Sequence, residues 1–348
     1  MKINDFKYLA AFSIPVFACL GMIYQGAWSF VTPFYAFVII PVLELIFPVD
    51  NSNLNQSQTE QLKTKTVFDW MLYLNLVVVY GLLIFGLVTV TSTILETYEF
   101  IGLIFSMGII AGVNGINVAH ELGHRQTTNE RFIGKALLLP ALYMHFYIEH
   151  NFGHHLHAAT KEDPATAKYN QTVYSFWVSS VFRQYFSAWN IQTKLLRNTG
   201  NPFFSYTNDM LWYMLIEVLY LLIILMVFGV TGFIFAFFSA IVGFILLETV
   251  NYIEHYGLLR LKTPSGRYER VQEIHSWNSN HIIGRIVLYE LTRHSDHHFK
   301  TTKKYQLLDC HTESPQMPYG YPTSMVLAMI PPLWFSIMNK RIPKDMIS

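Results

Sequence analysis

Six apolar stretches constrain this chain more than any other feature of its sequence. They cover about residues 8–27, 29–47, 69–91, 97–118, 210–230 and 232–252. A helix needs roughly 20 mostly apolar residues to cross a bilayer, and each stretch has about that length. Only 14% of the residues are charged, whereas soluble domains carry about 25%. We therefore expect an all-α integral membrane protein whose six transmembrane helices form three tight hairpins.

The first stretch lies in MKINDFKYLAAFSIPVFACLGMIY and has the charge pattern of a signal peptide. Its apolar run is too long for one and a second span follows at once, so we expect a retained helix. All 24 Lys and Arg residues lie outside the six stretches, in residues 1–7, 48–68, 119–209 and 253–348. Six crossings place these segments on one side of the membrane. The positive-inside rule makes that side the cytoplasm, and both termini are expected there.

The two longest polar segments, 119–209 and 253–348, are expected to form a mostly helical cytoplasmic cap on a single catalytic domain, residues 1–348. Their apolar pieces 134–148 and 322–338 are too short to span and fit interfacial or cap elements better. Residues 174–190 have an amphipathic pattern, and we expect them to lie along the membrane surface.

Charge and cysteine content exclude two further classes. The formal net charge is +1, and nucleic-acid binding needs a basic face that neutralises phosphates. Cys19 and Cys310 are the only cysteines, which rules out a disulfide framework and a built-in four-cysteine metal site.

Nine of the 14 histidines fall in four clusters at or just beyond expected cytoplasmic helix ends. The clusters are HELGH (120–124), EHNFGHH (149–155), NYIEHYG (251–257) and RHSDHH (293–298). The nine residues are His120, His124, His150, His154, His155, His255, His294, His297 and His298. Residues at i, i+3 and i+4 share one face of an α-helix. Three of the clusters are therefore expected each to present two or three imidazoles to one point.

A bound cation explains this density best. Imidazoles packed together repel when protonated and cost desolvation energy when buried, whereas a metal ion takes them as neutral ligands. Nine donors exceed the roughly four to six that one ion holds, so two ions are expected. Imidazole suits Fe, Cu, Zn and Ni, and the spacing by itself does not choose among them.

Ligand histidines usually donate their second ring N–H to a carboxylate or a carbonyl. Five acids adjoin the clusters or lie two turns before one and are candidates for this role: Glu121, Glu149, Glu254, Asp296 and Glu248. Asp163, in KEDPATAK, is a weaker candidate, because Asp-Pro is commonly only a turn.

The remaining histidines fit ordinary polar roles at helix ends or interfaces: His145, His157, His275, His281 and His311. Glu44 and Glu217, inside expected spans, receive no role.

Two other classes share some of these features. HELGH matches the H-E-x-x-H pattern of zinc proteases, in which Glu121 would be the general base, but such a site leaves the other clusters without a role. A metal transporter would need a polar ladder through the spans, which are largely apolar here.

Together the motifs NVAHELGHR, EHNFGHH with ATKEDPATAK, NYIEHYGLLR, HSWNSNH and RHSDHHFKTTKKYQ resemble the bacterial alkane 1-monooxygenases, integral-membrane di-iron enzymes of the desaturase and hydroxylase superfamily. The resemblance runs over about residues 110–340. It implies that the nine clustered histidines hold two non-haem irons and that the protein lies in the bacterial inner membrane. It also implies terminal hydroxylation of n-alkanes with O2 and two electrons from rubredoxin, supplied through rubredoxin reductase by NAD(P)H.

Related scaffolds keep alternatives open: a fatty-acyl desaturase or hydroxylase, or an alkyl-aromatic monooxygenase. The sequence reads YELTRHSDHH where the family commonly has Gln before the Arg, a departure that touches no ligand. It lacks paired CxxC motifs, so the rubredoxin is expected to be a separate protein. Lys300, Lys303 and Lys304 are expected to offer it a basic docking face, although positive-inside bias explains these lysines equally well.

Overall fold

The computed structural model describes residues 3–344, 346 and 347, and in this part of the chain the regular structure is helical, with only isolated β-bridges beside it. The expected all-α class is thus confirmed. The chain divides into two compact units. Unit 1 comprises Met1–Ile39, Thr66–Ile148 and Ala188–Leu247, and unit 2 comprises Ile40–Lys65, Glu149–Ser187 and Glu248–Ser348.

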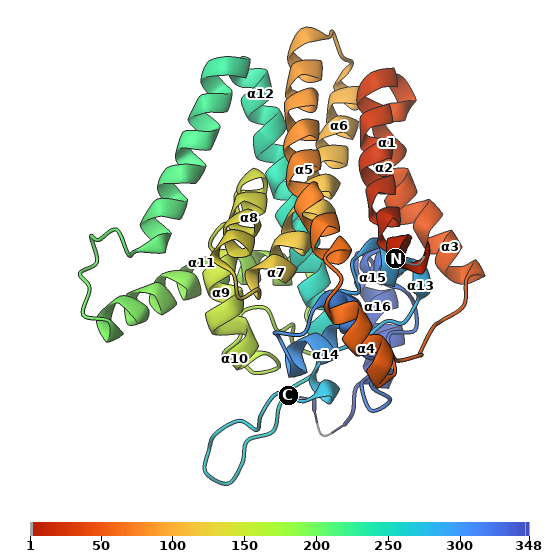
Figure 1. The fold of residues 1–348 in the computed structure, drawn as a ribbon, viewed down its shortest axis with the longest axis vertical. Helices are drawn as coiled ribbons and strands as arrows, with labels where there is room; N and C mark the ends of the chain where they lie inside the picture. The colour runs from red at the N-terminus through yellow and green to blue at the C-terminus, as the bar shows by residue number, and fades with distance from the viewer. Residues whose placement is uncertain (1–2, 345, 348) are drawn as a thin grey trace. The chain divides into compact units, whose positions relative to one another are not determined.

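Unit 1 contains most of the long apolar helices (Figure 1). Its elements are η1 (Ile3–Phe12), α1 (Ser13–Tyr24), η2 (Gly26–Phe30), α2 (Val31–Phe34), η3 (Tyr35–Ile39), α5 (Val67–Ser92), α6 (Thr97–Ile110), η4 (Ala111–Ile116), α7 (Asn117–Gly123), α8 (Thr128–Leu138), η5 (Leu139–Ala141), most of α9 (Phe146–Glu149), the end of α11 (Val173–Asn198) and most of α12 (Asp209–His255).

Five helical segments are long and apolar enough to cross a membrane: Asp5–Tyr24, Gly26–Ile46, Val67–Ser92, Thr97–Gly123 and Asp209–His255. The chain is therefore a multi-pass membrane protein. The segment Asp209–His255 contains both 210–230 and 232–252, the two stretches expected as separate spans, because it consists of two helices joined at a kink.

A sharp bend at Gly229 divides α12 into two arms, as Figure 1 shows. Gly229 has φ +64° and ψ −167°, a backbone conformation that only glycine adopts without strain. Each arm holds about the 20 residues that a single crossing requires.

Small and polar residues let the helices of unit 1 pack closely. A Cβ on Gly108 of α6 would lie 2.4 Å from the Val242 Cβ and 2.9 Å from the Ser239 carbonyl oxygen of α12. Asn114 of η4 donates to Asn75 of α5 at 2.8 Å, and both residues are fully buried. Close approach at glycine and hydrogen bonds between helices are the interactions that hold membrane helices together, since lipid provides no hydrophobic drive for their association.

Unit 2 contains short helices and long loops. Its elements are α3 (Ile40–Ile46), α4 (Gln56–Lys63), η6 (His150–His154), α10 (His155–His157), the first part of α11, the end of α12, η7 (Glu273–His275), α13 (Ile282–Val287), α14 (His294–Phe299), η8 (Tyr305–Leu307), α15 (Tyr321–Ala328), α16 (Pro331–Met338) and η9 (Asn339–Arg341). The chain breaks between α15 and α16 at the Pro-Pro pair, as the sequence indicates.

The HSWNSNH motif, residues 275–281, connects two histidine-bearing elements of unit 2. Trp277, from HSWNSNH, is buried and donates its backbone N–H to the Glu254 carbonyl at 2.8 Å and its indole N–H to the Tyr256 carbonyl at 2.9 Å. Asn278 accepts the backbone N–H of Ser295 at 2.9 Å. The same loop therefore binds both the end of α12 and the first turn of α14, two elements that carry clustered histidines.

Buried arginines anchor the start of α14. Arg293 donates to the carbonyl oxygens of Leu308 at 2.6 Å and Ser52 at 2.8 Å. Arg285 pairs with Glu290 at 2.6 Å and with Asp50 at 2.9 Å. A helix of six residues is too short to be stable alone, so these contacts fix where its histidines lie.

Candidate metal centre

Four histidines of unit 2 converge on one point, although they come from three distant segments. They are His154 of η6, His255 at the end of α12, and His294 and His298 of α14, and all are buried. One nitrogen of each lies within 4.8 Å of one nitrogen of every other. We call this set the four-histidine group.

The Nε2 atoms of this group form a connected series of close contacts. His154 lies 3.2 Å from His298, His298 lies 2.9 Å from His294, and His294 lies 3.2 Å from His255. Two donors bound to one ion at about 2.1 Å lie about 3.0 Å apart at a 90° angle and about 3.4 Å apart at the tetrahedral angle. The observed spacings lie at this separation.

The surroundings of His298 favour its neutral form. Burial lowers the pKa of His298 well below its ordinary value, and the neighbouring His294, His155 and His154 lower it further. A neutral imidazole has one N–H. A single proton on His294 Nε2 therefore cannot form hydrogen bonds that explain both of its close contacts, to His255 and to His298. The donors are buried and convergent, and this set fits a metal ion of the type that nitrogen ligands prefer.

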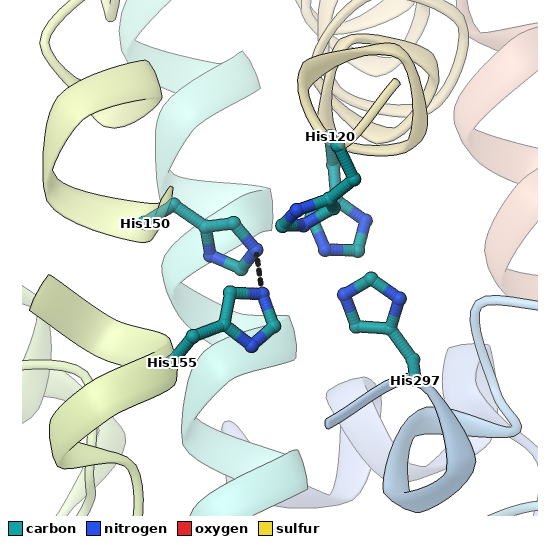
Figure 2. A group of neighbouring side chains, drawn as sticks. His120, His150, His155 and His297 are labelled. Atoms are coloured by element: carbon teal, nitrogen blue, oxygen red, sulfur yellow. Dashed lines mark hydrogen bonds between the residues drawn. The ribbon is translucent and has the colours of Figure 1, made fainter. Parts of the chain in front are cut away.

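A second set lies beside it in unit 2: His150, His155 and His297, the three-histidine group. One nitrogen of each lies within 4.8 Å of one nitrogen of the others. The His150 and His155 Nε2 atoms are 2.9 Å apart, and Figure 2 shows these two rings and the His297 ring turned toward one another.

This grouping differs from the one that α-helical spacing predicts. His150 and His154, at i and i+4, go to different groups, while His150 pairs with His155 at i+5. The reason is local: residues 150–154 form a π-turn in which the His155 N–H donates to the His150 carbonyl. A π-turn brings residues five apart onto one face, and such turns are frequent at functional sites. In α14, likewise, His297 separates from His294 and His298.

The last two clustered histidines belong to unit 1. His120 lies on α7 and His124 follows its last residue, and their ring centroids are 5.2 Å apart. Between them Glu121 pairs with Arg125 at 2.9 Å, and Arg125 also pairs with Asp69 of α5 at 3.1 Å. These ion pairs fasten α7 to α5.

Asp163 contacts the clustered histidine His154 directly, although the sequence made it a weaker candidate because Asp-Pro is commonly only a turn. Its Oδ2 lies 3.0 Å from His154 Nδ1 and accepts the Thr166 hydroxyl at 2.6 Å, and its Oδ1 accepts the Ala165 N–H at 3.1 Å. Burial would raise the pKa of Asp163, but His154, His255 and the Thr166 hydroxyl together outweigh it and hold that pKa below its ordinary value. An ionised Asp163 fixes the proton on Nδ1 and leaves Nε2 free to bind a metal.

Asp296 has a different role from the expected one. Its carboxylate accepts Lys303 Nζ at 2.6 Å, the Asp309 N–H at 2.8 Å and lies 2.8 Å from His311 Nε2. It therefore ties α14 to the following loop. Lys303, which also pairs with Asp309 at 2.6 Å, is turned inward and is not a free docking lysine.

Glu149 and Glu248 are also buried. Glu248 accepts the Gln184 amide at 2.8 Å on both oxygens, and Glu149 accepts the Ser187 hydroxyl at 3.4 Å. Burial and the Asp163 and Glu248 carboxylates raise the pKa of Glu149 well above its ordinary value.

Glu254 points toward the donor side of the four-histidine group, with Oε2 3.2 Å from His294 Nε2. Behind it lies the buried Tyr321, whose pKa is raised well above its ordinary value by burial and by the Glu254 carboxylate. Tyr321 was not among the site residues predicted from the sequence.

The other histidines have the polar or packing surroundings that the sequence predicts. His275 accepts the Gln272 N–H at 2.9 Å, and His281 lies 2.9 Å from the Ser279 hydroxyl. His157 lies 3.6 Å from Glu162. His145 packs against Tyr143, and burial lowers its pKa to about 3.

Comparisons with known proteins identify the family of this chain. The fatty acid desaturase family profile matches residues 96–326. Alkane 1-monooxygenase 1 of Pseudomonas aeruginosa is 38% identical over 90% of this chain and 83% of its own length. Alkane 1-monooxygenase 2 of Alcanivorax borkumensis is 34% identical over 98% and 92%, and the xylene/toluene monooxygenase hydroxylase component XylM of Pseudomonas putida is 29% identical over 97% and 89%. The chain belongs to the alkane 1-monooxygenases, within the membrane desaturase and hydroxylase superfamily.

Proposed function

We propose that this protein hydroxylates the terminal methyl group of medium-to-long n-alkanes at a centre of two irons. The convergence of four buried Nε2 atoms in unit 2 is the observation that carries the proposal. The similarity to alkane 1-monooxygenases supports the alkane as substrate.

The nine clustered histidines are the proposed ligands. The four-histidine group would hold one ion and the three-histidine group would hold the other. His120 and His124 would complete the second ligand set, because their i, i+4 spacing on α7 presents two imidazoles from one helix end.

The reaction converts an alkane, O2, two electrons and two protons into a 1-alkanol and water. A terminal C–H bond offers nothing for general acid–base catalysis, and bound iron would supply the oxidising power that breaks it. The chain's own residues would orient the ligand rings and exclude water from the centre. The buried imidazoles keep solvent from the centre, and Asp163 holds the His154 ring in the ligand tautomer.

Substrate and electrons would arrive from different directions. Alkanes partition into lipid, so an apolar path among the spans would collect them from the bilayer. A separate rubredoxin, reduced through rubredoxin reductase by NAD(P)H, would deliver electrons from the cytoplasm. Lys300 is exposed and available to such a partner, whereas Lys303 is engaged in ion pairs.

The orientation is part of the proposal. Six crossings of the bacterial inner membrane, with the two arms of α12 counted separately, would leave both termini in the cytoplasm.

The test is turnover by the purified chain in lipid nanodiscs with iron, rubredoxin, its reductase and NADH. We expect 1-alkanols from octane to hexadecane and two tightly held irons per chain. His255→Ala should abolish product and lower bound iron. His157→Ala, the same change on a histidine outside both groups, should retain both.

Three results would contradict the proposal. An alkene product would favour a desaturase, exchangeable zinc without oxidation would favour a protease or a transporter, and full turnover by His255→Ala would remove that residue from the centre.

The relationship to XylM supports a second candidate, hydroxylation of a methyl group on an aromatic ring. Xylene in the same assay separates the two: faster turnover of xylene than of every alkane would favour the aromatic substrate.

A further inference from the structure

The Glu254 carboxylate faces the ring nitrogen of His294 that would bind a metal, whereas a carboxylate that only orients a ligand histidine contacts its other ring nitrogen. Its Oε2 lies 3.2 Å from His294 Nε2, the ring nitrogen that also faces His255 and His298. Asp163, by contrast, meets His154 at Nδ1, the nitrogen on the opposite side of the ring. Asp163 therefore stands behind a ligand, while Glu254 stands among the donor atoms.

The distance matches shared coordination. An oxygen and a nitrogen bound to one ion at about 2.1 Å lie about 3.0 to 3.4 Å apart for bond angles between 90° and the tetrahedral value. The 3.2 Å between Glu254 and His294 lies inside that interval, as do two of the three contacts between imidazoles, and the third, 2.9 Å between His298 and His294, lies just below it. A plain hydrogen bond would place a proton on His294 Nε2 or on the Glu254 carboxyl group, and in either case the lone pair of that nitrogen would no longer be free to bind a metal.

Charge favours the same assignment. Four neutral imidazoles carry no charge, and the Asp163 carboxylate behind His154 offsets only part of the double charge of a divalent ion in a site where every ligand is buried. Buried charges are stable only when they are paired or coordinated. Glu254 is 1% exposed and lies at contact distance, so its carboxylate is placed to cancel part of that charge.

We propose that Glu254 is a direct ligand, an anionic fifth donor beside His154, His255, His294 and His298. This inference rests on the proposed metal centre. It makes the two ions chemically unequal: one carries a carboxylate, and the other is held by imidazoles.

The test uses the full-length protein in nanodiscs, loaded with ⁵⁷Fe for Mössbauer spectroscopy and separately with Co(II) for visible absorption. Glu254→Gln keeps shape and a hydrogen-bond acceptor but removes the charge. We expect it to change the signal of one of the two metals and to weaken that metal's binding by about 100-fold, at or above the 10- to 100-fold loss typical of outer partners. Glu44→Gln, the same change on a buried acid of unit 2 that lies in neither histidine group, should leave both signals as in the wild type.

Two further variants separate coordination from folding. Glu254→Asp retains the charge on a shorter side chain and should bind the metal more tightly than Glu254→Gln. Glu254→Ala should recover the wild-type Co(II) spectrum on addition of formate, which supplies a carboxylate to the vacated space. Unchanged metal spectra and affinity in Glu254→Gln would overturn the assignment, as would failure of formate to alter a folded Glu254→Ala. A wild-type chain that binds no metal would instead defeat the proposed function.

Discussion

Asp163→Asn tests how the four-histidine group is supported. The carboxylate receives three groups: the Nδ1 side of His154, the Thr166 hydroxyl and the Ala165 N–H. Asparagine has one acceptor oxygen in place of two, so it cannot accept from both His154 and Ala165, which meet different oxygens of the carboxylate. Its NH₂ group would then face a donor.

The expected loss of metal affinity follows from the loss of the Asp163 carboxylate as a partner of His154. Removing an acidic partner from a ligand histidine typically weakens metal binding by 10- to 100-fold, or about 1.4 to 2.7 kcal/mol. We expect Asp163→Asn to weaken one of the two metals by this amount and to leave the other within about twofold. Competition with a chelator of known affinity, followed by Co(II) absorption, measures each site.

Asp309→Asn is the matched control. It changes another aspartate of unit 2, one whose carboxylate pairs with Lys303 rather than with a clustered histidine. Its metal affinities should equal those of the wild type. If Asp163→Asn binds both metals as tightly as this control, then Asp163 does not support a ligand and the reasoning is refuted.

Two further substitutions test the fold. Gly108→Ala should lower the free energy of unfolding by about 1–3 kcal/mol, because its methyl group would overlap Val242; in thermal unfolding in detergent, Gly81→Ala, which meets no atom within 4 Å, should be close to wild type, and equal melting of the two variants would contradict the packing argument. Burial would raise the pKa of Asp50, but Ser52 and Arg285 outweigh it and lower it to about 2, from 3.8. Asp50 thus stabilises the folded chain above about pH 4, and this contribution is lost as the pH falls through 2. The wild type should therefore unfold at a higher temperature than Asp50→Asn at pH 5 and lose this advantage toward pH 2; a constant difference would disprove the linkage.

Within the described residues, the helical class and the membrane character of the chain follow from its sequence. Length and apolarity identify membrane-spanning helices because a bilayer requires backbone hydrogen bonds to close within a helix. The break between the last two expected spans also lies near its expected place: the sequence predicts it at residue 231, and the structure has it at Gly229, whose positive φ interrupts the helix.

The clustered histidines were also visible in the sequence, because imidazoles are rare in so apolar a chain. Their division into groups was not. The α-helical rule assigned His150 and His154 to one point, and a π-turn separated them. Spacing predicts a shared face only when the type of helix is known, and short helices take their type from the contacts around them.

The acidic residues near the clustered histidines were likewise visible in the sequence, but their contacts were not. Proximity in sequence brought Glu254 and Asp296 forward as equal candidates and ranked Asp163 below them. The structure turns Asp296 toward Lys303, places Asp163 behind His154, and directs Glu254 at the donor side of His294. Composition and periodicity determined that this chain crosses a membrane and gathers imidazoles. Only tertiary structure decided which oxygen meets which ring nitrogen, because a side chain's partners come from segments that the linear order does not relate.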